Sequence, residues 1–510
     1  MNFSASVPHL RSFAVLAPLA AGLCVGAVGC RVGPNYAPPD LTHRSGAAWT
    51  DATSEKSPDA GGPGKAEGET GVIGPADAAT LATWWRSFED SELTSLVERA
   101  FEGNLDLVEA RERVIAARAR RGIENAARLP SLDAETSYRR TQSGREATSL
   151  GGGPAGEETD VYALGVVAGW EVDLWGRVGR LVEARDAEIA FAIEDFRAAR
   201  VALAAELARE VILVRSLDER TRVVERTIAL NQQSVEIAES RVRGGLASEL
   251  DLVRARRTLA TDRALLPELA GQRRAAEHRA AVLLGLRPGE LAIARASLPE
   301  PPSLPALGLP AELVTRRPDI RRAERQLAAA TARIGAAEAE RYPRVSLSGT
   351  FSLSSDTPGG VLDSDAGVLS AGPTITLPLF RGGAIDANIE AANSEARQAL
   401  TRVESSVLGA VREVETALAL HRQARRRVVE LQDAATQARD AERLATSLYA
   451  SGRTDFINVI DAQSQLLLID ERLVLTRQGR LERIIDLYAA LGGGWEPQPE
   501  TALANKAAQP

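Results

Sequence analysis

The chain has 510 residues, a hydrophobic content of 44% and a net charge of −8 at pH 7. Aromatic residues make up only 4% of it, and alanine, arginine, leucine and glutamate dominate its middle, which favours long helices over a sheet-rich globule. Acidic and basic residues are interspersed, and no basic block with interleaved aromatic residues occurs. The sequence therefore predicts no nucleic-acid partner.

The N-terminus is typical of a lipoprotein signal peptide, which we assign to residues 1–29. An apolar run over residues 13–28 is short for a permanent membrane helix. It ends in Ala27, Val28 and Gly29, small residues that precede Cys30. We expect cleavage before Cys30 and attachment of palmitate-type lipid to its sulfur. The alternative is an ordinary buried cysteine after a generic signal.

After the signal, the chain divides into four parts. Residues 30–80 form an N-terminal extension whose second half is a Gly- and Pro-rich flexible linker, and residues 495–510 form a disordered tail. Between them lies an internal duplication, with a first repeat at 81–300 and a second at 301–494. Corresponding segments are spaced about 205 to 213 residues apart. They are 129–132 with 342–345, 173–177 with 378–382, and 245–252 with 452–459.

Each repeat is predicted to run helix, strand, loop, strand, very long helix, tight turn and long helix. Alternation of apolar and polar residues places the strands at 132–138, 162–174, 345–353 and 374–379. About ten alternating residues can cross a membrane as a tilted strand, although a half-buried soluble sheet has the same pattern.

Residues 178–243 and 384–450 lack proline and contain almost no glycine. Each would make a helix of about 100 Å at 1.5 Å per residue. Apolar residues recur at threes and fours and the other faces are charged, which suits the wall of a water-filled tube. In the returning helix of the first repeat, Pro267 should kink or end the helix near Leu266.

No arrangement of residues predicts catalysis. The histidines lack metal-ligand spacing and no phosphate-binding loop occurs, so we expect neither an enzyme nor a cofactor or bound metal. His278 and His421 lie in charged helical stretches and are expected to be solvated.

Six short motifs follow one another along residues 30–491. They are Cys30-Arg31-Val32-Gly33-Pro34-Asn35-Tyr36, Trp84-Trp85-Arg86-Ser87-Phe88, Asn104-Leu105-Asp106, Leu129-Pro130-Ser131-Leu132, Trp170-Glu171-Val172-Asp173-Leu174-Trp175-Gly176-Arg177 and Arg316-Arg317-Pro318-Asp319-Ile320. Together these motifs resemble the TolC-like outer membrane factor family, in its NodT/OprM-like lipoprotein branch.

The resemblance implies a mainly α fold with a β-barrel portion. Four transmembrane strands per subunit would share one barrel in a homotrimer, and helical hairpins would form a periplasmic α-barrel. It implies a lipid-anchored outer-membrane channel in a tripartite efflux system, a passive conduit for drugs or toxic compounds. The partners would be a periplasmic adaptor (membrane fusion) protein, an RND inner-membrane pump and outer-membrane lipid. A type I secretion conduit for polypeptides is the alternative.

The family also has acidic residues at a constriction near the tip of its second hairpin. By this resemblance Asp461 and Asn458 line a periplasmic gate, and only Asp461 keeps the acidic charge. Arg453 and Tyr449 would hold neighbouring hairpins together there. The alternative is that Asp461 and Arg453 are ordinary solvated helix charges.

Overall fold

A computed structural model describes residues 31–46, 49, 78–142, 158–304 and 316–495. Within it the chain divides into two compact units. The first takes residues 1–38, 116–190 and 324–401, and the second takes 39–115, 191–323 and 402–510. Each unit draws on both sequence repeats, so the compact units do not coincide with the repeats.

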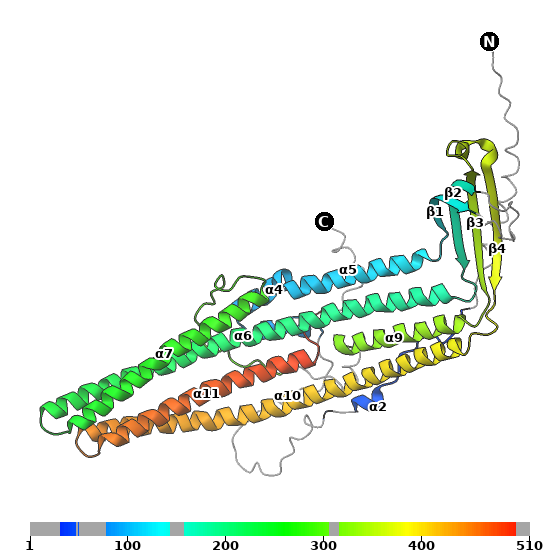
Figure 1. The fold of residues 1–510 in the computed structure, drawn as a ribbon. Coiled ribbons are helices and arrows are strands. Elements are labelled where there is room, and N and C mark those ends of the chain that lie inside the picture. The colour runs from blue at the N-terminus through cyan, green and yellow to red at the C-terminus, as the bar shows by residue number, and fades with distance from the viewer. Residues whose placement is uncertain (1–30, 47–48, 50–77, 143–157, 305–315, 496–510) are drawn as a thin grey trace. The chain divides into compact units, whose positions relative to one another are not determined.

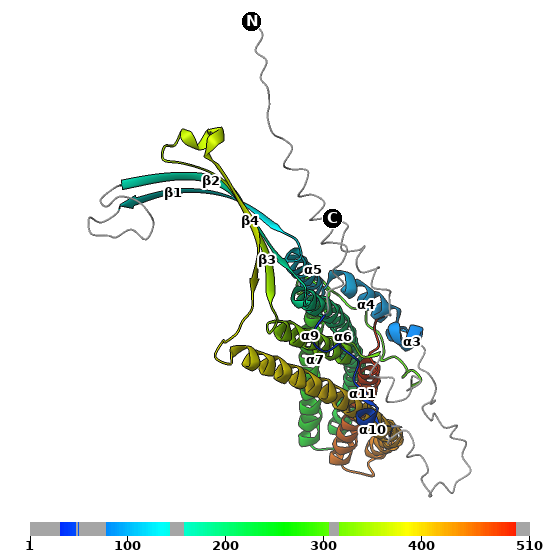
Figure 2. The same cartoon turned by 90° about the vertical axis from the view of Figure 1, so that its right-hand side faces the viewer.

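The first unit contains an antiparallel sheet of four strands in the order β1-β2-β3-β4 (Figure 1), which Figure 2 shows after a turn of 90°. The strands are β1 (Ser131–Gln142), β2 (Glu158–Val172), β3 (Arg344–Ser355) and β4 (Gly367–Thr376). The strand predicted at 374–379 is wrong in position, because β4 ends at Thr376. Alternation between 367 and 373 is weakened by small residues, whereas pairing of β4 with β3 begins at Gly367 opposite Leu353. Backbone pairing therefore decided the position of this strand.

The pairing register gives the sheet one apolar face. Across all four strands the residues on this face pair directly with one another. They include Leu132, Ala134, Tyr138, Tyr162, Leu164, Val166, Trp170, Leu347, Phe351, Leu353, Leu369 and Ile375. The opposite face carries mainly serine, threonine, glycine and acidic side chains. This alternation across a whole sheet is that of strands with lipid on one side and water on the other.

The helices have matching lengths in the two repeats (Figure 1). The first repeat has α5 (Leu105–Ala126), α6 (Arg177–Arg243) and α7 (Glu249–Leu283), and the second has α9 (Pro318–Ala339), α10 (Ala384–Ala450) and α11 (Phe456–Ala490). The paired lengths are 22, 67 and 35 residues. The shorter elements are α2 (Thr42–Ser45), α3 (Ala78–Ala82), η1 (Trp84–Phe88), α4 (Ser91–Gly103), η2 (Gly360–Leu362) and η3 (Ser364–Ala366). None of the helices in the described ranges is both long and apolar enough to cross a membrane.

Of the two effects expected of Pro267, a kink or an end of the helix near Leu266, the end is wrong, because α7 continues through Pro267 to Leu283. Proline removes one backbone hydrogen bond from the ladder. Flanking contacts hold the helix in place: Leu269 is buried with Leu217 of α6, and Leu266 packs against the same cluster. Packing between the two antiparallel helices therefore outweighs the local preference of a single residue.

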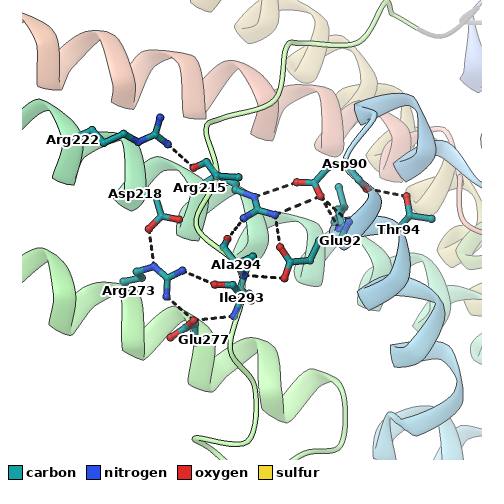
Figure 3. A network of polar contacts seen from close by, with 12 residues as sticks. Asp90, Glu92, Thr94, Arg215, Asp218, Arg222, Arg273, Glu277, Ile293 and Ala294 are labelled. Atoms are coloured by element: carbon teal, nitrogen blue, oxygen red, sulfur yellow. Dashed lines mark hydrogen bonds and ion pairs between the residues drawn. The ribbon is translucent and has the colours of Figure 1, made fainter.

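Two arginines, Arg215 buried and Arg273 half-buried, hold the connection between the repeats to the second unit's helices (Figure 3). Arg215 of α6 donates to the backbone oxygen of Ala294 and, over 2.6 Å, to Glu92. Arg273 of α7 donates to the backbone oxygen of Ile293 over 2.6 Å. The Ala294 amide in turn donates to Glu92 over 2.9 Å. The connection is thus held by charge-assisted hydrogen bonds rather than by regular secondary structure.

Candidate gate at the hairpin tips

Both hairpins of the second unit turn through the same backbone motif. In the second repeat Gly452 has a φ of +74°, and the amides of Gly452 and Arg453 donate back to Tyr449 and Leu448 over 2.9 and 2.8 Å. In the first repeat Gly245, with a φ of +67°, stands in the equivalent place. Glycine reaches this left-handed conformation without a Cβ clash, so it ends each long helix and starts the return.

Three of the four predicted gate residues are exposed at this turn. Arg453 and Asn458 are exposed, and the Asn458 amide donates to the Thr454 hydroxyl over 2.7 Å. Asp461 is also exposed and lies three residues after Asn458 on α11. Residues three apart share a helix face, so Asn458 and Asp461 present their side chains to the same side.

Tyr449, the fourth predicted residue, lies apart from the other three in the core. Its side chain is 3% exposed and its ring centre lies 5.0 Å from that of Phe456. Burial raises the pKa of the Tyr449 hydroxyl, with a further contribution from the negative charge of Asp251. The ring belongs to a cluster of both hairpins that includes Val235 and Leu259.

The structure adds a residue that the sequence reasoning missed. Arg241 of α6 donates from Nη1 to the backbone oxygens of Tyr449 and Ala450 over 2.6 and 3.2 Å. Its guanidinium carbon lies 4.8 Å from the centre of the Tyr449 ring. A cation at a helix C-terminus is favoured by the helix dipole. The position equivalent to Arg241 in the second repeat is the apolar Leu448. A charged residue at a position that is apolar in the other repeat is the feature of the sequence that could have pointed to Arg241.

His421 is buried, contrary to expectation. It is 3% exposed, and its pKa is lowered to about 4, first by burial and then by the positive charges of Arg480 and Arg425. The charged residues next to His421 in the sequence led us to expect that it is exposed to solvent. The burial of a helical residue depends instead on the face of the helix on which it lies. His421 shares that face with Ala417 and Val428, which are both buried.

Cys30 lies outside the described residues. The segment that follows it, residues 31–36, packs against α6 and α9 in the first unit through hydrogen bonds of Val32, Gly33 and Tyr36.

A sheet with one apolar face, joined in sequence to paired helices of 67 and 35 residues, defines an outer-membrane channel subunit with a periplasmic helical part. The family model described as outer membrane efflux protein matches residues 96–286 and 309–493. The chain belongs to this family, and its function is efflux across the outer membrane.

Relatives match nearly the whole chain. Outer membrane protein OprJ of Pseudomonas aeruginosa is 33% identical over 84% of this chain and 90% of its own length. Nodulation protein T of Rhizobium leguminosarum bv. trifolii is 30% identical over 93% of this chain and 97% of its own length. Among solved structures, the outer-membrane channel OprN aligns with a TM-score of 0.80 and 33% identity, over 92% of this chain and all of that one.

Proposed function

We propose that three copies of this chain form one channel, which joins a periplasmic adaptor protein and an RND inner-membrane pump and releases small toxic molecules. The main support for this proposal is that the four-stranded sheet is not closed into a barrel. Both β1 and β4 are edge strands in the described chain, and unpaired edges are not tolerated in lipid. Four strands are too few to close a membrane barrel, so further copies must pair with both edges.

Names of relatives support the efflux role. A Pseudomonas putida relative, 31% identical, is called the solvent efflux pump outer membrane protein SrpC, and another is called a toluene efflux pump outer membrane protein. The pump supplies the energy in such an arrangement, so the channel itself needs only a conduit and a gate.

Expression beside an adaptor and RND pump in cells that lack their own outer-membrane channel tests this function. We expect resistance to several pump substrates to rise at least about fourfold, because the pump regains an exit through the outer membrane. The same chain beside an inactive pump should give no rise. Correct outer-membrane insertion without any gain in resistance would reject the proposed work with an RND pump, and export of a type I polypeptide substrate would then support the alternative.

We also propose that Cys30 carries the lipid anchor. The apolar run and the small residues before Cys30 support this, together with the docked segment that begins at Arg31. Cells fed a fatty-acid analogue should label the wild type and leave Cys30→Ser unlabelled, whereas equal labelling of both proteins would remove the lipid proposal.

For the gate, we propose that Asp461 side chains of three copies line the narrowest part, with Asn458 beside them and Arg453 and Tyr449 near the contacts between hairpins. The exposed common face of Asn458 and Asp461 supports this. Arg241 also donates a hydrogen bond to the end of α10, which supports the further proposal that Arg241 helps to hold the two hairpins together.

A further inference from the structure

Residues 31–36 form an arm whose backbone is held by one fully buried side chain of α6. Arg180 is 1% exposed. Its Nε donates to the backbone oxygen of Val32 over 3.0 Å, and its Nη2 donates to Gly33 O and Asn35 Oδ1 over 2.9 and 3.0 Å. The guanidinium thus donates three hydrogen bonds to a segment that lies about 145 residues away in the sequence.

The arm also bridges the two repeats. The Val32 amide donates to the backbone oxygen of Trp175, just before α6, over 3.2 Å. At the other end of the arm, the Tyr36 hydroxyl donates to Glu324 of α9 over 2.9 Å. Burial and this hydrogen bond raise the pKa of Tyr36, so its hydroxyl keeps its proton and remains a donor at neutral pH.

Two glycines leave room for the arm between the helices. A Cβ on Gly33 would lie 2.3 Å from the Cα of Gly335 in α9. A Cβ on Gly335 would lie 2.7 Å from Nε of Arg180 and 2.9 Å from the backbone oxygen of Val32. These distances are too short for carbon, so the slot accepts the arm only because both positions lack a side chain.

We infer that Arg180 and Gly335 form a receptor slot for the N-terminal arm, with Arg180 as its positioning residue. The docked arm holds Arg31 beside the junction between β2 and α6, where its Nη2 donates to the backbone oxygen of Gly179 over 3.1 Å. What the arm carries rests on the proposed lipid attachment, but its docking does not. A lipid on the residue before the arm would then anchor the channel wall itself, because the arm is docked on α6 and α9.

The slot also sets an order of assembly. One wall comes from α6 of the first repeat and the other from α9 of the second, at positions 180 and 335. The arm can therefore dock only after both repeats have come together, and once docked it braces one against the other.

Trypsin cleavage between Arg31 and Val32, on the intact protein in membranes, tests the slot. A protease needs an extended segment, and both backbone groups of Val32 are occupied in the docked arm. In Arg180→Met we expect a new N-terminus at Val32 to appear at least about tenfold faster than in the wild type, since cleavage follows the population of the undocked arm. Arg185→Met is the matched control, because Arg185 lies on the same helix and its ion pairs go to Glu124 and Glu188.

Gly335→Ala provides a second, independent perturbation and decides the matter if Arg180→Met does not reach the membrane. It should expose the same bond because the added Cβ displaces Val32. Protection of the bond in both variants would overturn the slot. Fatty-acid labelling in parallel separates the two proposals: an unlabelled wild type with a protected bond removes only the lipid, and a labelled wild type that is cleaved as fast as Arg180→Met removes only the slot.

Discussion

Arg180, Arg215 and Arg317 are buried, and each donates to a backbone oxygen in a distant segment. Lysine occurs only at three positions of the full chain, Lys56, Lys65 and Lys506. A guanidinium offers five donors in a planar fork, so one side chain can join a carboxylate and a carbonyl at once. At the scale of single residues, arginine side chains therefore connect segments that do not pair with each other through regular secondary structure.

The prediction at the scale of single residues concerns Asp461. Two carboxylates about 6 Å apart repel by about 0.7 kcal/mol in bulk water and about 3 kcal/mol at an effective dielectric of 20. A ring of three should therefore attract cations. In planar bilayers we expect cation selectivity with block by divalent ions from the periplasmic side, and Asp461→Ala should weaken that block by about tenfold, which corresponds to about 1.4 kcal/mol.

Asp440→Ala is the control for that measurement, because Asp440 is an exposed carboxylate on α10 that pairs with Arg443. It should leave the divalent block unchanged. Unchanged selectivity and block in Asp461→Ala would place Asp461 away from the constriction and reject the proposed ring.

At the scale of elements, exposed apolar side chains lie just after β4 and between the last turn of α5 and the start of β1. Leu379 and Phe380, just after β4, are 88% and 89% exposed. Ile123, in the last turn of α5, and Leu129, just before β1, are 75% and 66% exposed. If β4 of one copy pairs antiparallel with β1 of the next, both groups lie at the same end of the shared seam. Their mutual burial would stabilise the contact between copies.

Crosslinking of Ile123→Cys with Leu379→Cys tests this seam. The wild-type chain has only Cys24 and Cys30, so the background is low. Mild oxidation of the double variant, combined with Cys30→Ser, should give covalent dimers and trimers. Leu105→Cys with Leu379→Cys should not, since Leu105 lies about 27 Å from Ile123 along the same helix. A trimeric mass without crosslinks would reject this contact alone, whereas a monomeric mass would reject the trimer.

At the scale of the whole molecule, the duplication and the compact units divide the chain differently. The sheet takes β1 and β2 from the first repeat and β3 and β4 from the second. In the second unit, α6 of the first repeat pairs with α11 of the second through Arg220 with Glu471 and Arg477 with Glu219, over 3.1 and 2.8 Å. One buried cluster takes Val235 and Leu259 from the first repeat and Tyr449 and Phe456 from the second, so each repeat covers apolar surface of the other.

The family, the order of the main elements and the bounds of the two longest helices and of β3 could be predicted from the sequence alone. Helix α10 was predicted at its observed bounds, and α6 within one residue, because a 3.6-residue period persists along them without proline. Strand β3 was likewise predicted within two residues at either end. Local periodicity is a property of neighbouring residues, so it can be read from the chain directly.

Only the tertiary structure decided which side chains meet across large sequence distances. Arg241 contacts Tyr449 208 positions later, and Arg180 holds the arm at Val32 148 positions earlier. The burial of His421 and the continuity of α7 through Pro267 also depend on what packs against a helix face. No local pattern encodes these pairings, because their free energy comes from surfaces that meet only after the chain has folded.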